Sequence, residues 1–228
     1  LLAEGEDALA DSDEDIEAVR KAQRIAAVMR SIRADDEAVV AYLGRVDVAE
    51  QAWQLNATGE RALAEGRLGD GGDGALQAFR AVLELQPRQP RAMQGLAAVE
   101  SAMIRKAEVA ADEADFDTAS RWLAHAHEVR PDDGLSTVVD ARERIERTRA
   151  ARIVRLRDLG IAALPKINGV NVARGHLAEL LRIARPAEPA ATELRERIDL
   201  AVHYGLYGPG QVFTDALKGG GRGPQMAV

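Results

Sequence analysis

Side chains that could support catalysis or bind a metal are few in this chain, which has four histidines and no cysteine. His125 and His127 are the closest pair. Two positions apart on a helix, they point about 200° away from each other and cannot chelate one ion. His176 and His203 stand alone, as is typical of surface or half-buried helix positions. The lack of cysteine excludes disulfides, thiolate metal sites and a cysteine nucleophile.

The acidic run from Asp11 to Asp15 briefly resembles a calcium loop. Ile16 stands where such a loop needs glycine, and Ala22 where it needs glutamate. We interpret the run as the acidic first turn of a helix, favoured by the helix dipole. The stretch 69–74 holds four glycines and two aspartates. We interpret it as an insertion between helices, because no Lys-Ser or Lys-Thr follows it as a phosphate loop requires.

A row of seven arginines lies between residues 142 and 157, opposed there only by Glu143 and Glu146. We interpret it as a face that is solvated or paired with acidic neighbours, such as those near residues 4 to 17. A protein-contact surface, or binding of nucleic acid or lipid, are the alternatives. The whole chain has 37 acidic against 30 basic residues and a formal charge of −7, which argues against nucleic-acid binding.

The sequence shows no pattern typical of a catalytic centre, and its two tryptophans do not indicate one. An exposed tryptophan would mark an interface, but we expect Trp122 to pack partly into the core, while Trp53 is the only other one. No Ser-His-Asp arrangement or nucleophile elbow occurs. The sequence therefore predicts a protein that is not an enzyme, with no catalytic, cofactor-binding or metal-binding residues and no cofactor.

Composition predicts an all-α chain. Alanine, leucine, arginine and glutamate, which have high helix propensity, are abundant. Apolar Ala92, Leu96, Val99 and Met103 recur at helical spacing. Aromatic residues make up only 4%, and a core of small side chains favours thin layers of helices. No run of about 18 apolar residues occurs, so we expect no direct membrane insertion.

A short pattern recurs four times: a small residue followed three positions later by Ala-Leu or Ala-Ala. The small residues are Gly5, Gly59, Ala107 and Gly160, separated by 54, 48 and 53 positions. A turn-like segment follows each pattern. After three of these turns comes an alanine, a larger apolar residue four later and a closing proline. These sets are Ala75, Phe79 and Pro87; Ala119, Leu123 and Pro131; and Ala173, Leu177 and Pro186.

These residues resemble the tetratricopeptide repeat. The third unit fits best, with its residues at the family's spacing: Ala107, Ala110, Ala114, Phe116, Ala119, Leu123, Ala126 and Pro131. The period here is about 50 residues against 34 for the family. The extra length follows each proline, where residues 91–113 and about 134–163 are predicted to be single long helices.

The resemblance implies stacked antiparallel helical hairpins in a right-handed solenoid-type array over residues 1–205. The hairpins are expected near 1–50, 51–99, 100–150 and 151–205. A last helix from Pro189 to about Tyr204, with Leu194, Ile198 and Val202 on one face, is expected to cap the stack. Residues 206–228 have the Gly/Pro composition of a linker to a missing downstream domain.

We expect this chain to be a segment of a longer protein, and both of its ends favour this interpretation. At the N-terminus, the chain begins within a helical pattern and without an initiator Met. The final residues Gly223-Pro224-Gln225-Met226-Ala227-Val228 resemble the entry to a formylglycine-generating-enzyme-like (sulfatase-modifying factor) domain. That resemblance implies a bacterial protein with such a domain downstream. It also implies that the active residues of that domain would all lie outside this chain.

We therefore predict a non-catalytic helical-repeat scaffold that binds a protein or peptide partner, with no nucleic acid and with a homodimer as an open alternative. The alternative function is the extracytoplasmic sensor region of a membrane-anchored signalling protein, such as a Ser/Thr kinase. The expected location is periplasmic, with cytoplasmic as the alternative.

Overall fold

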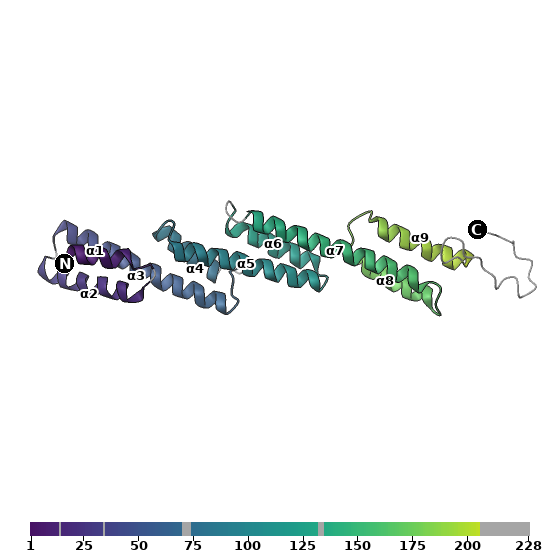
Figure 1. Ribbon diagram of the computed structural model, residues 1–228, viewed down its shortest axis with the longest axis horizontal. Helices are drawn as coiled ribbons and strands as arrows, with labels where there is room; N and C mark the ends of the chain where they lie inside the picture. The colour runs from purple at the N-terminus through teal and green to yellow at the C-terminus, as the bar shows by residue number, and fades with distance from the viewer. Residues whose placement is uncertain (14, 34, 70–73, 132–134, 206–228) are drawn as a thin grey trace, which may run out of the picture. The chain divides into compact units, whose positions relative to one another are not determined.

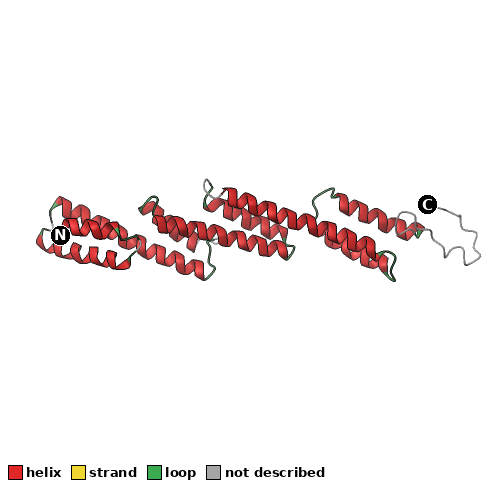
Figure 2. Ribbon diagram, viewed as in Figure 1, coloured by secondary structure: helices red, strands yellow, loops and turns green. Residues whose placement is uncertain are grey.

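The computed structural model describes residues 1–13, 15–33, 35–69, 74–131 and 135–205. In this part of the chain every regular element is a helix (Figure 2), so the predicted all-α class is confirmed. The helices are α1 (Leu2–Ala10), α2 (Ile16–Ile32), α3 (Glu37–Ala64), α4 (Ala75–Leu85), α5 (Pro90–Asp112), α6 (Phe116–Val129), α7 (Leu135–Ala163), α8 (Gly169–Ile183) and α9 (Pro189–Tyr204).

Acidic caps fix the start of several helices. Asp15 accepts a hydrogen bond from the Glu17 backbone N–H at 2.8 Å, and Asp36 accepts one from Ala38 at 3.0 Å. These carboxylates pair with donors that the first helical turn leaves without partners. The acidic run at Asp11–Asp15 was predicted to form the first turn of a helix, but it precedes α2, and Asp15 is the N-cap of that helix. Residue 14 lies outside the described residues.

The predicted helix ends are confirmed. Helices α4, α6 and α8 stop two or three residues before Pro87, Pro131 and Pro186, because proline lacks the N–H that would continue the helix. The long helices predicted over 91–113 and 134–163 are α5 and α7. The divisions expected near residues 50, 99 and 150 fall inside α3, α5 and α7, and the domain boundaries themselves stay a prediction.

The chain divides into two compact units. The first comprises residues 1–107 and 120–141, and the second comprises 108–119 and the residues from 142 onward. Helices α5, α6 and α7 contribute to both. The predicted linker, residues 206–228, lies outside the described residues.

In the first unit, α1, α2 and α3 pack together around Tyr42 (Figure 1, purple to blue). The Tyr42 ring is fully buried, and its hydroxyl donates a hydrogen bond to the Ala22 carbonyl on α2 at 3.1 Å. On α1, a Cβ at Gly5 would lie 2.6 Å from the Tyr42 Cζ. Because residue 5 has no side chain, the Tyr42 ring can fill the space beside α1. The ring therefore contacts α1 and α2 from its place on α3.

A second aromatic ring joins α3, α4 and α5. Phe79 on α4 is fully buried. A Cβ at Gly59 on α3 would come within 2.8 Å of its ring, and one at Gly95 on α5 within 2.5 Å. The predicted stripe of Ala92, Leu96, Val99 and Met103 is buried along α5, which confirms that periodicity.

In the second unit, Gly160 on α7 receives the side chain of Leu194 on α9, whose Cδ1 would lie 2.7 Å from a Cβ at Gly160. Two sequence assignments need correction here. Leu180 is fully buried on α8, whereas Leu177 is only half-buried. On α9 the buried stripe ends with Ala201, and Val202 is 47% exposed, because 3.6 residues per turn carry the stripe past it.

Candidate functional site

The histidines noted in the sequence do not converge. His125 and His127 both lie on α6, where His125 meets the Trp122 ring edge-on with 6.0 Å between centroids. Trp122 is half-buried, as expected, and Lys106 on α5 lies 4.5 Å from the centre of its ring. Among the described residues, no group of three or more His, Asp or Glu side chains could hold a metal ion. Residues 70–73 of the glycine-rich stretch lie outside the described residues.

Buried polar side chains join α3 to the start of α5 in the first unit. Asn56 is 1% exposed and its amide nitrogen donates to Gln89 Oε1 at 3.3 Å. The same Gln89 oxygen accepts from the Ala92 backbone N–H at 2.7 Å. Next to them, Arg91 binds Glu60 through two nitrogens and lies 4.0 Å from the centre of the Trp53 ring. These contacts hold α3 against the start of α5. They were not predicted from the sequence.

A buried carboxylate lies further along α5. Glu100 is 1% exposed, accepts from Arg130 Nε at 3.0 Å and accepts a hydrogen bond from the Thr137 hydroxyl on α7. Arg130 keeps access to solvent, with 26% of its side chain exposed. A buried charge of this kind needs its partners, so we assign Glu100 a role in holding the helices together.

The arginine row of α7 is largely paired within the second unit, which agrees with the preferred interpretation of its charge. Its partners differ from those expected near residues 4 to 17. Arg144 binds Glu108 on α5, Arg152 binds Glu179 on α8 at 3.2 Å, and Arg157 binds Glu193 on α9 at 3.4 Å. The acidic residues near the N-terminus pair locally instead, as Glu4 does with Lys21 and Glu6 with Arg45.

Two further contacts tie α7 to its neighbours. Arg149 donates to the Ile183 carbonyl at the end of α8 at 2.6 Å, and its guanidinium lies 5.3 Å from the Phe116 ring centre on α6. Arg157 also donates to Asp158, a hydrogen bond that raises the pKa of the Arg157 guanidinium. One side of α7 is thus attached to the helices of its own unit.

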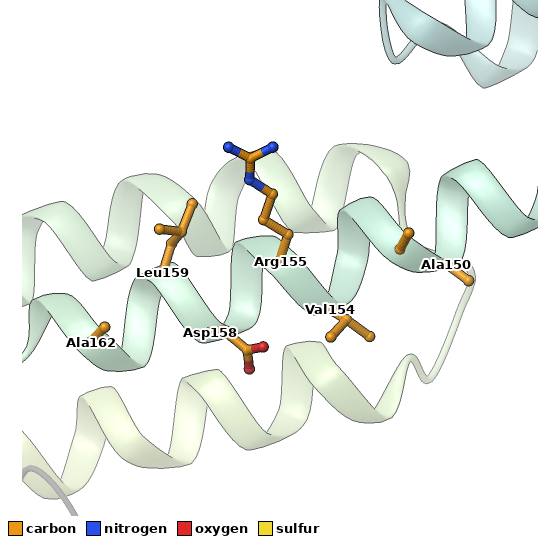
Figure 3. Close-up of a pocket in the computed structure, with 7 residues that line it drawn as sticks. Ala150, Val154, Arg155, Asp158, Leu159 and Ala162 are labelled. Carbon is orange, nitrogen blue, oxygen red and sulfur yellow. The ribbon is translucent and has the colours of Figure 1, made fainter.

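Another side of α7 is apolar and open to solvent. A shallow depression on it is lined by Ala150, Ala151, Val154, Arg155, Asp158, Leu159 and Ala162, which we call the α7 open face (Figure 3). Val154 and Leu159 are each 44% exposed, while Ile153 and Leu156 beside them are buried. Exposed apolar side chains gathered on one helix face are typical of contact surfaces. This face was not predicted from the sequence, because arginines dominate the same segment.

Comparison with protein-family models, curated proteins and solved structures gave no match for this chain. No helix in the described ranges combines the length and apolar character needed to cross a bilayer. The geometry of α7 offers a surface: ion pairs hold one side of this long helix, and aliphatic side chains are exposed on another.

Proposed function

We propose that this chain is a non-catalytic helical scaffold that mediates protein–protein interaction through the α7 open face. The observation that supports it most is the exposure of Val154 and Leu159 on a helix whose arginines bind α5, α8 and α9. Leaving two large aliphatic side chains in water forgoes about 1–2 kcal/mol each relative to burial. A partner that covers them would gain this free energy.

The scaffold that we propose is a series of stacked antiparallel hairpins of tetratricopeptide type with elongated helices. Glycines that receive a bulky side chain from another helix, such as Gly59 with Phe79 and Gly160 with Leu194, support it. Each hairpin alone would bury little apolar area, so neighbours must stack. The right-handed array, the capping role of α9 and the periplasmic location stay predictions. The formylglycine-generating-enzyme-like neighbour rests on residues 223–228, outside the described residues.

Site-specific photocrosslinking tests the proposal in cells that produce the protein. A benzoylphenylalanine at Leu159 is expected to give discrete protein adducts after irradiation, identified by mass spectrometry. Leu181 on α8 is the matched control, because it is 47% exposed but lies outside the α7 open face. Replacement of Val154 by Glu should abolish the adducts at position 159. An absence of adducts at 159, or identical adducts at 181, would contradict the proposal.

A further inference from the structure

Two buried polar atoms in the first unit have no hydrogen-bond partner within the described residues. Asn56 Oδ1 on α3 is an acceptor, and Arg91 Nη1 near the start of α5 is a donor. Asn56 is only 1% exposed. Buried polar groups of folded proteins are almost always bonded, either to protein or to ordered water. These two atoms therefore indicate a contact beyond those between the side chains themselves.

The orientation of the Asn56 amide follows from its neighbours. The Ala92 backbone N–H, in the first turn of α5, donates to Gln89 Oε1 at 2.7 Å. Because that oxygen accepts, the Asn56 group that faces it at 3.3 Å is the donor nitrogen. A reversed amide would place two oxygens against each other. Asn56 Oδ1 consequently points away from Gln89 and needs a donor from elsewhere.

The guanidinium of Arg91 lies over the same part of α3. It is 4.0 Å from the centre of the Trp53 ring, and it binds Glu60 through Nε and Nη2 at 2.7 and 2.8 Å. Trp53 stands three positions before Asn56 and Glu60 four positions after it, so all three share one face of the helix. The remaining nitrogen, Nη1, is thus held beside Asn56, yet no hydrogen bond joins the two residues.

From these relationships we infer that an ordered water molecule binds between Asn56 Oδ1 and Arg91 Nη1. The water donates a hydrogen bond to the amide oxygen and accepts one from the guanidinium, because a water molecule can do both. At ordinary hydrogen-bond lengths, a single water joins polar atoms that are up to about 6 Å apart. Buried waters that satisfy such groups are a regular part of folded proteins.

This water completes a chain of polar contacts between α5 and α3. The chain runs from the Ala92 N–H through Gln89 and Asn56 to the water, and from there through Arg91 to Glu60. The contact between the two helices is therefore hydrated at this point, and position 56 requires a side chain that both donates and accepts. The water site is independent of the α7 open face, so neither proposal depends on the other.

A high-resolution crystal structure of the whole chain tests the site directly. We expect a water oxygen at about 2.7–3.2 Å from both Asn56 Oδ1 and Arg91 Nη1. A direct hydrogen bond between the two side chains, or no water density between them, would overturn the inference.

Magnetic relaxation dispersion of water oxygen, which detects long-lived internal waters, tests the same site in solution. Asn56→Leu removes the acceptor at similar size, and Arg91→Met removes the donor, so each variant should contain one such water fewer than the parent. Gln54→Leu is the matched control, because Gln54 lies on α3 at an exposed position. It should keep the number of long-lived waters of the parent.

Arg91→Met also protects the test against misfolding, since the Arg91 side chain is 22% exposed and lies at the edge of the contact. Circular dichroism shows which variants fold. An unchanged number of long-lived waters in the folded variants at positions 56 and 91, or an equal loss in Gln54→Leu, would refute the water bridge.

Discussion

The ring of Phe79 fills the space that a side chain at Gly95 would occupy: a Cβ there would lie 2.5 Å from the Phe79 Cε1 and Cζ atoms. The two residues belong to consecutive helices, α4 and α5. The ring is fully buried, and it also lies against Gly59 on α3. Because the buried ring lies where a Cβ at either glycine would stand, this contact limits how closely the helices can approach.

Gly95→Ala should therefore destabilise the protein, although alanine is the better helix former. We expect overpacking to lower the free energy of unfolding by about 1–3 kcal/mol. Gly44→Ala on α3 is the control, because a Cβ there meets nothing within 4 Å. It should stabilise by about 0.5–1 kcal/mol through helix propensity. Urea unfolding of both variants measures the contrast, and a gain for Gly95→Ala would show that the ring position is wrong.

Tyr42 should make stability depend on alkaline pH. Its burial, with a smaller contribution from the Glu6 carboxylate, raises the pKa of the phenol above 10.0. The unfolded chain then loses this proton at lower pH than the folded one. The stabilisation is complete below pH 10 and is lost as the pH rises through the folded pKa.

Tyr42→Phe removes this dependence. Below pH 10 the variant should be less stable by about 0.5–1.5 kcal/mol, because the hydrogen bond to the Ala22 carbonyl is lost. Between pH 8 and 11, urea unfolding should show this deficit shrinking. Tyr204→Phe, at an exposed tyrosine, is the control. Parallel curves for Tyr42→Phe and the parent would refute the assignment.

Removing Arg130, the less buried partner of the Glu100–Arg130 pair, should lower the free energy of unfolding more than removing Glu100. Arg130→Met leaves a carboxylate that is 1% exposed without its cation, which should lower the free energy of unfolding by about 3–5 kcal/mol. Glu100→Met leaves the partly exposed Arg130 guanidinium and the exposed Thr137 hydroxyl, which water can solvate, and its effect should be about 1–2 kcal/mol. The double variant should recover most of the loss. Urea unfolding of the two single variants and the double variant measures these free energies. A larger loss for Glu100→Met than for Arg130→Met would count against this geometry.

Gln89 lies between two helices, but its side chain should contribute more to the free energy of unfolding than that of an exposed residue does. Gln89→Ala leaves the Asn56 amide and the Ala92 N–H without their acceptor, with an expected loss of about 1–3 kcal/mol. Asn56→Ala should then have a smaller effect in the Gln89→Ala background than in the parent. Gln54→Ala, an exposed position on α3, should change stability by less than about 0.5 kcal/mol. Additive effects of Gln89→Ala and Asn56→Ala would contradict a shared network.

Local features of this fold were readable from the sequence, because they depend on spacing within one helix. The proline stops, the Ala92 to Met103 stripe and the start of α9 at Pro189 are of this kind. The burial of Glu100 was not readable, since it depends on Arg130 and Thr137, about 30 residues or more away. The α7 open face was also missed: periodicity shows that a helix has an apolar stripe, but the choice of covered and open side depends on its neighbours.

The position of Gly59 on α3 has a consequence for the sliding of helices. One turn before it stands Leu55, and one turn after it Leu63. If α4 moved along α3 by a single turn, about 5.4 Å, the aromatic ring of Phe79 would meet a leucine side chain instead of a gap. Gly59 therefore leaves room for the Phe79 ring at one position along α3. The leucine side chains one turn away on either side oppose a shift of α4 in both directions.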